Sequence, residues 1–378
     1  MSICGGRTSP NVEKPISSDA LARALHVRGR VLPGGEQRDL YVVDGRITDE
    51  ATPNAYTVAE GWVVPGLVDA HCHVGLDEHG PVSDDTCEEQ AIADRDTGAL
   101  LLRDAGSAAD TRWIDERVDL PRIIRAGRHI ARPRRYIRNY AWEIEPDQLS
   151  EYVAKEAERG DGWVKLVGDW IDRDAADLTP CWPADALEKA IRVAHDHGAR
   201  VTAHVFGEHA LPDLLGAGID CIEHGTGLSG ELIDFMAARG VALVPTAKQL
   251  DNFPVYADAG EARYPLYAVH MRELYARRKE TIRSAYEAGV PIYAGTDAGG
   301  VLPHGLLAEE VIELAEYGLT TEDALSAASW RARDWLGRPA RLDDGDSADF
   351  VVYDANPLED LTVLRHPARI ILRGQVIS

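Results

Sequence analysis

The chain has few cysteines and no long apolar segment, and both shortages narrow the class of protein. Its five cysteines are scattered and include no Cys-x-x-Cys pair, which excludes a disulfide framework and a thiolate zinc site and favours a reducing compartment. No apolar run approaches the roughly 18 residues of a membrane-spanning helix, and the first residues lack the apolar centre of a signal peptide. We therefore expect a cytoplasmic protein that does not bind membranes.

Basic residues are also scarce. The chain has 40 lysines and arginines but 63 acidic residues, which gives a net charge of −23. Such a charge repels phosphate backbones and anionic lipid, so it argues against nucleic acid as a partner. Hydrophobic residues make up 45% of the chain and charged residues 27%, which excludes disorder of the whole chain. The expected partner is a small-molecule substrate.

The middle of the 378-residue chain alternates short apolar runs with longer amphipathic stretches. This pattern is typical of parallel strands joined by helices, and hence of an α/β fold. A clear helix is expected at 183–197. Eight strands are expected, at 63–68, 99–102, 122–125, 163–167, 200–205, 220–223, 241–244 and 291–294. Eight β/α units over about 270 residues match a (β/α)₈ TIM barrel.

The two ends of the chain carry short β-type runs and tight turns instead. Asp44-Gly45 joins two such runs near the N-terminus, and Arg373-Gly374 joins two near the C-terminus. We expect residues 1–62 and 336–378 to form the two parts of a small β-sandwich beside a barrel at 63–335. Within the first part, residues 1–20 are rich in Gly, Ser and Pro and are expected to be a loose leader.

Side chains of metal-binding type stand at the ends of several expected strands. His71 and His73 close the first, and because alternate residues of a strand share a face, their rings point the same way. His204, His224 and Asp297 stand at three other strand ends. Strand ends of a barrel converge on one site, and imidazole and carboxylate are ordinary zinc ligands. The sequence therefore predicts a metal site.

A lysine stands inside another apolar strand, in Trp163-Val-Lys165-Leu-Val. An ammonium group beside a divalent cation is repelled, so within such a site the amine has to be neutral or converted to an anion. On an edge strand, the same lysine would simply reach solvent. The residues alone leave both interpretations open.

Together these residues resemble the metal-site pattern of the amidohydrolase superfamily. The matching stretches are Pro65-Gly-Leu-Val-Asp-Ala-His71-Cys-His73, Lys165, His204, Glu223-His224-Gly-Thr and Gly295-Thr-Asp297-Ala-Gly, with Gly345-Asp-Ser-Ala-Asp-Phe-Val-Val-Tyr-Asp near the end. The chain is similar to the imidazolonepropionase-like branch, which includes metal-dependent Xaa-Pro and Xaa-Arg dipeptidases. The resemblance covers nearly the whole chain.

The resemblance implies a binuclear metallohydrolase that cleaves a peptide-like, N-acyl or cyclic amide bond. It implies that one divalent ion is held by His71, His73 and Asp297, and a second by His204 and His224. Zinc is the expected metal, with manganese, iron or cobalt as alternatives, because the same N and O ligands accept all of them.

The resemblance also gives Lys165 a role that removes the charge problem. Carboxylated by carbon dioxide, it would be an anion that bridges both metal ions. A hydroxide shared by the two metals would attack the carbonyl, because metal coordination lowers the pKa of water. Asp297 would be the catalytic residue that takes the hydroxide proton and passes it to the leaving nitrogen.

Two positions near the expected substrate depart from the family. Relatives commonly have Thr-Gly-Gly-His after the third strand, whereas this chain has Arg132-Pro-Arg-Arg-Tyr136, which puts Tyr136 where a substrate-facing histidine would be. Phe206, two residues after His204, replaces a Tyr or His that hydrogen-bonds substrate in some relatives. Both departures indicate a shifted or less polar substrate.

Three residues are tentative substrate ligands. Besides Tyr136, Arg135 belongs to an arginine cluster that suits a substrate carboxylate, although a solvated loop or a subunit contact explains the cluster equally. His304, in the last loop, either contacts substrate or caps a helix. Glu223 is expected to point outward from its strand and is left out of the site.

Other functions remain open on the sequence. A mononuclear deaminase or cyclic-imine hydrolase uses the same barrel, but it needs a His-x-x-Glu at a strand end, and none is present. Esterase or lactonase activity would use the same hydroxide. A non-catalytic scaffold is a further alternative, because fold does not fix function. It ranks last, because a chain that had lost catalysis would have lost some ligands and all six are present. The substrate and the oligomeric state are undetermined, with a homo-oligomer as one possibility.

Overall fold

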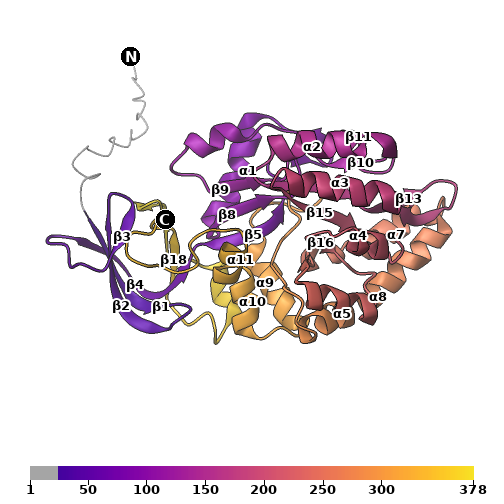
Figure 1. Ribbon diagram of the computed structural model, residues 1–378. Coiled ribbons are helices and arrows are strands. Elements are labelled where there is room, and N and C mark those ends of the chain that lie inside the picture. The colour runs from indigo at the N-terminus through magenta and orange to yellow at the C-terminus, as the bar shows by residue number, and fades with distance from the viewer. Residues whose placement is uncertain (1–23) are drawn as a thin grey trace, which may run out of the picture.

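The computed structural model describes residues 24–378, so the expected leader at 1–20 lies outside the described residues. Both ends of the described chain meet in one seven-stranded sheet beside a larger unit of strands and helices (Figure 1). In spatial order its strands are β20 (Gln375–Val376), β19 (Arg369–Leu372), β18 (Phe350–Tyr353), β4 (Tyr56–Pro65), β1 (Leu25–Val31), β2 (Glu36–Val43) and β3 (Arg46–Thr48). The expected pairing of the two ends is present, but these strands form one sheet and the β-sandwich is not confirmed.

Alternating apolar residues give this terminal sheet its own small core. Val27, Leu40, Val63 and Phe350 come from four different strands and are fully buried in one cluster. The turn between β2 and β3 is the expected one at Asp44-Gly45, where both residues have positive φ, as a tight hairpin turn requires.

The larger unit is built on two parallel sheets. The first has the order β5 (Leu67–Cys72), β8 (Ala99–Asp104) and β9 (Arg122–Arg125). The second has the order β11 (Trp142–Glu143), β10 (Ile130–Ala131), β12 (Trp163–Val167), β15 (Arg200–Val205), β16 (Cys221–His224) and β17 (Ala242–Val244). Most of the expected strands lie within two or three residues of these bounds, and the molecule has an α/β fold.

The expected strand at 63–68 is wrong in its bounds, because the chain changes partner inside it. Val64 pairs with Val351 in the terminal sheet, whereas Leu67 N donates to Gly98 O at 2.9 Å beside β8. Gly66 stands between them, and a Cβ there would lie 2.8 Å from a methyl carbon of Leu100. Since both sheets bury apolar side chains, the apolar run alone does not reveal the switch.

The expected strand at 291–294 forms a single isolated bridge, between Ile292 and Leu243, instead of a ladder. Tyr293 N donates to Leu243 O of β17 at 3.0 Å, and Ala70 N of β5 donates to Ala294 O at 2.8 Å. This segment therefore links the two parallel sheets on one side. The ladders among residues 24–378 do not form one continuous closed sheet.

Helices follow most of the parallel strands and cover them on the outside (Figure 1). They are α1 (Asp84–Asp96), α2 (Leu149–Arg159), α3 (Ala184–Asp196), α4 (Leu211–Gly216), α5 (Gly230–Arg239), α6 (Ala247–Leu250), α7 (Phe253–Glu261), α8 (Pro265–Glu287), α9 (Leu307–Glu316), α10 (Thr321–Ala327) and α11 (Trp330–Trp335). Helix α3 matches the helix expected at 183–197. Within residues 24–378, every helix is too short or too polar to cross a membrane.

His270 on α8 ties this helix to two loops beside the parallel strands. Its ring nitrogens lie 2.9 Å from Asp177 Oδ1, on β14 (Asp177–Pro180), and 2.8 Å from Glu208 Oε2, after β15. Its hydrogen bonds to the Glu208 and Asp177 carboxylates raise the pKa of His270 to about 9, against the opposing effect of burial. The stabilisation is complete below the unfolded pKa of about 6.5 and is lost as pH rises through the folded pKa.

We predict that His270→Gln lowers the melting temperature at pH 7 and that this deficit shrinks at pH 10, where the parent has also lost the imidazolium. Thermal unfolding at both pH values measures it. His79→Gln serves as the control, because the His79 side chain is 81% exposed. An equal deficit at both pH values would contradict the assignment.

Candidate metal centre

Three of the predicted ligands form a compact cluster beside the end of β5. The Nε2 atoms of His71 and His73 lie 3.2 Å apart. Asp297 Oδ1 lies 3.1 Å from the first and 3.0 Å from the second. Their ligand atoms all lie within 4.8 Å of one another, which is close to the spread expected around one ion with ligand bonds of about 2.0–2.2 Å.

Backbone hydrogen bonds hold this cluster in place. Asp297 N donates to His71 O at 2.7 Å, and His73 N donates to Ala298 O at 2.8 Å. Asp297 has a φ of 58°, a left-handed conformation that costs free energy in a non-glycine residue and concentrates at functional sites. The geometry that aims the carboxylate at the two imidazoles is therefore imposed by the surrounding structure.

The other two predicted histidine ligands meet each other from neighbouring strands. His204 is the last residue but one of β15 and His224 ends β16, and Nδ1 of the first lies 3.0 Å from Nε2 of the second. The Nδ1 atom of His224 lies 2.7 Å from Thr246 Oγ1. Since the ring centres of His71 and His224 are 5.4 Å apart, the two groups are parts of one site.

Lys165 is fully buried and lies beside His71. Its Nζ atom is 3.4 Å from His71 Nε2. Strand β12 has β10 on one side and β15 on the other, so the interpretation of Lys165 as an edge-strand lysine that reaches solvent is wrong. Burial lowers the pKa of Lys165, which favours the neutral, nucleophilic amine.

Hydrogen bonds orient the first two histidines. His73 Nδ1 donates to Gly106 O at 2.8 Å, and His71 Nδ1 donates to a carboxylate oxygen of Glu223 at 2.6 Å. Each ring therefore turns its Nε2 atom toward the other. Against the effect of burial, the charges of Glu223 and Asp297 raise the pKa of His71, so His71 offers Nε2 to a metal only in its deprotonated form. Burial lowers the pKa of His73 to about 4 and that of His224 to about 3, so both are neutral at pH 7.

Glu223 does not point outward as expected, but lies fully buried behind His71. Its other oxygen accepts a 2.6 Å hydrogen bond from Arg103 Nη2. Burial alone would raise the pKa of Glu223, but the charges of Arg103 and His71 hold it well below its usual range. Glu223, held by Arg103, thus presents a carboxylate to His71 and fixes the orientation of the His71 ring.

Arg103 was missed by the sequence reasoning, although a signal was present. It stands in the run Leu100-Leu-Leu-Arg103-Asp, a charged residue inside an apolar strand, as Lys165 is. Its side chain is fully buried, and Nε donates to Ala70 O at 2.6 Å. Two charged residues inside apolar strands indicate a common polar site, and here Arg103 pairs with Glu223 while Lys165 Nζ lies 3.4 Å from His71 Nε2.

A cavity of about 530 Å³ opens over the metal-binding cluster, from which His73, His204 and Asp297 reach its wall. The rest of its lining is dominated by aromatic rings, namely Tyr136, Tyr140, Trp170, Phe206, Tyr256, Tyr264 and Tyr267. Its size falls within the range of pockets for small organic ligands, about 300–1,000 Å³. Such a lining favours a flat, largely apolar ligand group.

The three candidate substrate ligands lie in different places in the structure, and one of them lines the cavity. Tyr136 lines the cavity, with its ring centre 4.9 Å from that of Trp170 and 5.5 Å from that of His204. Arg135 is not in the lining, because its guanidinium pairs with Asp172 at 2.9 Å and donates to three further oxygens of the hairpin made by β13 (Asp169–Asp172) and β14. The substrate role of Arg135 is therefore not supported.

His304 also lies outside this cavity. Its Nδ1 atom is 2.7 Å from Asp94 Oδ2 on α1, and its side chain is buried. The charge of Asp94 outweighs the effect of burial and raises the pKa of His304. The contact with α1 accounts for this histidine better than contact with substrate.

His129 was not singled out from the sequence because it follows no strand end. It is fully buried, and neither ring nitrogen has a hydrogen-bond partner among the described residues. Its ring centre lies 5.0 Å from that of His73 and 5.1 Å from that of Tyr136. A buried imidazole without partners costs free energy, so His129 belongs with the candidate site residues.

The amino-acid sequence is similar to those of several known proteins. An uncharacterized protein of Mycobacterium tuberculosis is 58% identical over 356 residues, which cover 94% of this chain and 96% of that protein. The ochratoxinase of Aspergillus niger is 25% identical over 230 residues, or 59% of this chain and 47% of that enzyme.

Two crystal structures extend the comparison to the fold. A Xaa-Pro dipeptidase with bound methionine superposes with a TM-score of 0.80 at 21% identity, over 93% of this chain and 99% of that one. The A. niger ochratoxinase superposes with a TM-score of 0.74 at 19% identity, over 94% of this chain and 96% of that one. At the sequence level, the pattern of the amidohydrolase family matches residues 62–377. The chain therefore belongs to the amidohydrolase family.

Proposed function

We propose that this protein is a metal-dependent hydrolase that cleaves an amide bond in a small substrate carrying an aromatic group. Family membership supports a hydrolase that acts on carbon–nitrogen bonds. The observation that carries the proposal is the convergence of His71, His73 and Asp297 within 4.8 Å, with the Nε2 atoms of the two imidazoles facing one another. Amidohydrolases generally use metal ions, and this donor set fits a divalent cation such as zinc, with manganese, iron and cobalt as alternatives.

We propose two ions rather than one. His71, His73 and Asp297 would hold the first, and His204 and His224 the second. Between them, the buried neutral amine of Lys165 would add carbon dioxide and lose a proton, which converts it to a carbamate anion that bridges both ions. A mononuclear site would leave Lys165 as a buried amine beside a cation.

The chain's own groups would then orient the substrate and move its proton. When bound, divalent ions supply Lewis acidity, which polarises a carbonyl and lowers the pKa of water. Burial opposes ionisation of Asp297, but the neighbouring His71 and His73 hold its pKa well below the usual range, so it is a carboxylate at neutral pH. Asp297 would accept the proton of the attacking water and deliver it to the leaving nitrogen.

The fold proposal follows the same family. We propose that the two parallel sheets and the bridging segment at 291–294 form the wall of a (β/α)₈ barrel over residues 63–335. Solved amidohydrolase structures that match this chain are of the TIM-barrel type. The ligand-bearing strand ends would then lie at the carboxyl face, where barrel enzymes have their active sites.

The first prediction from the proposed function concerns Lys165. Metal content by plasma mass spectrometry should be near two ions per chain in the parent and lower in Lys165→Ala, whereas Lys189→Ala, which changes an exposed lysine, should match the parent. Isotope-labelled bicarbonate should give a carbamate carbonyl signal in the NMR spectrum of the parent and not in Lys165→Ala. A single ion in both proteins would point instead to mononuclear, deaminase-type chemistry.

The second prediction concerns Glu223 as a positioning residue. Glu223→Gln keeps the side-chain shape but removes the carboxylate that holds His71, so metal affinity should fall about 10–100-fold. Competition with a chelator measures the affinity, with Glu188→Gln as an exposed control. Unchanged affinity in a folded Glu223→Gln variant would refute the role.

The third prediction concerns the aromatic cavity. Trp170→Ala should lower kcat/KM about 2–10-fold for an N-acyl amide with an aromatic acyl group, because an aromatic pair is worth about 0.5–1.5 kcal/mol. The N-acetyl analogue should be hydrolysed equally by both proteins, and Trp62→Ala, in the terminal sheet, should affect neither. Equal losses for both substrates would indicate a general structural effect instead.

A further inference from the structure

A second cavity, of about 260 Å³, lies between the terminal sheet and the parallel strands. It is lined by Leu100 and Leu101 near the start of β8 and by Arg122, the first residue of β9. His71 stands near the end of β5, which runs parallel to β8. Because parallel strands share one direction, the second cavity lies at the opposite end of the sheet from the metal centre.

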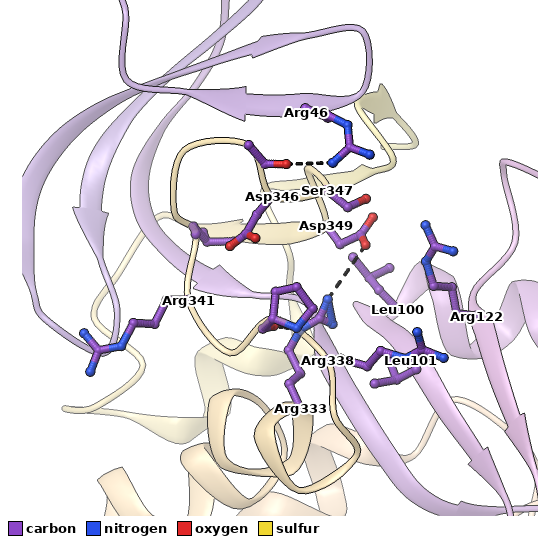
Figure 2. A pocket seen from close by; sticks show the side chains of 13 residues that line it. Arg46, Leu100, Leu101, Arg122, Arg333, Arg338, Arg341, Asp346, Ser347 and Asp349 are labelled. Atoms are coloured by element: carbon purple, nitrogen blue, oxygen red, sulfur yellow. Dashed lines mark hydrogen bonds and ion pairs between the residues drawn. The ribbon is translucent and has the colours of Figure 1, made fainter. Parts of the chain in front are cut away.

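Arginines dominate the lining of this cavity. Five are present, namely Arg46, Arg122, Arg333, Arg338 and Arg341, against the two carboxylates of Asp346 and Asp349. Figure 2 shows that Arg341 extends away from the others, whereas Arg333 faces Asp349 in the middle of the group. The other guanidinium groups come from three separate elements, β3, β9 and the segment after α11.

Three of the five arginines have no side-chain hydrogen bond or ion pair within residues 24–378, namely Arg122, Arg338 and the outward-extending Arg341. Arg46 donates to Gly345 O at 2.7 Å, and Arg333 donates to Pro339 O at 3.0 Å and lies 3.8 Å from Asp349 Oδ2. The side chains of Arg122 and Arg338 are exposed, and among the described residues neither has an ion pair or hydrogen bond. Burial, with the positive charges of Arg122 and Arg338, lowers the pKa of Arg333, so the three charges are close enough to repel.

A group of like charges in a concave site of a chain with net charge −23 needs an explanation. Guanidinium groups that converge without acidic partners are suited to bidentate binding of an oxyanion. The Ser347 hydroxyl, also in the lining, adds a neutral donor.

We infer that this cavity binds a compact oxyanion of the phosphate class, either free phosphate or diphosphate or the phosphoryl group of a small ester. A volume of about 260 Å³ is below the range of about 300–1,000 Å³ for larger organic ligands. The inference is independent of amide hydrolysis, because none of the lining residues belongs to the metal centre.

A bound oxyanion would join two parts of the molecule. Arg46 belongs to the terminal sheet, whereas Arg122 and Arg338 belong to the larger unit. An anion that bridges them stabilises the folded chain by mass action, because the unfolded chain has no such cavity. The ligand should therefore raise the melting temperature as well as give a binding isotherm.

Calorimetric titration of the full chain with diphosphate, at constant ionic strength, tests the inference. The parent should bind it saturably, and the double variant Arg122→Gln, Arg338→Gln should bind at least about tenfold more weakly, because a charge-assisted hydrogen bond is worth about 1.5–3 kcal/mol. The control, Arg173→Gln with Arg239→Gln, removes two exposed arginines elsewhere and should bind as the parent does.

Parallel titrations with inorganic phosphate and with glycerol phosphate distinguish the free ion from an ester, and melting temperatures with diphosphate or with sodium chloride give a second readout. The inference stands if diphosphate raises the melting temperature of the parent and not of the double variant. Binding that survives unchanged in the double variant would assign the anion to the metal centre and overturn the inference. A parent that responds equally to diphosphate and to sodium chloride would also overturn it.

Discussion

The buried carboxylate of Glu223 is the constraint on which the metal centre depends. A carboxylate at 0% exposure is tolerable only when it is paired and hydrogen-bonded, and here Arg103 and His71 each approach it within 2.6 Å. Arg103 is in turn enclosed by the rings of Trp163 and Trp335, at 4.6 and 5.1 Å from their centres. The group spans β5, β8, β12 and β16, so these strands have to be in register before His71 can face its neighbours.

Much of the fold follows from the sequence because hydrophobic period and strand direction are local signals. The apolar runs near residues 99, 122, 163, 200 and 241 are strands in the structure. The partner change at Gly66 was not predictable, because Val64 and Leu67 are equally apolar and only the position of β18, far along the chain, separates them. The segment at 291–294 forms one isolated bridge rather than a ladder, which depends on its neighbours and not on its composition.

Part of the candidate site could likewise be predicted from the sequence, and part could not. Strand-end positions correctly bring His71, His73 and Asp297 together, because side-chain direction in a strand alternates regularly. The roles of residues on loops or between strands were harder to predict from the sequence, since their partners are set by tertiary structure. Arg135 forms an ion pair with Asp172, and His304 forms one with Asp94. His129 is buried beside His73 with no strand end to mark it.

The position of β4 in the terminal sheet has a consequence for how the chain is made. One neighbour of β4 is β1, which precedes it closely, but the other is β18, which follows much later in the chain and is therefore synthesised much later (Figure 1). Until then the apolar edge that will receive Val351 is open, and open edges pair with other chains. Pairing across so much sequence is slow. Loss of the C-terminal segment would therefore unseat the strand that leads, through Gly66, directly into the one that carries His71.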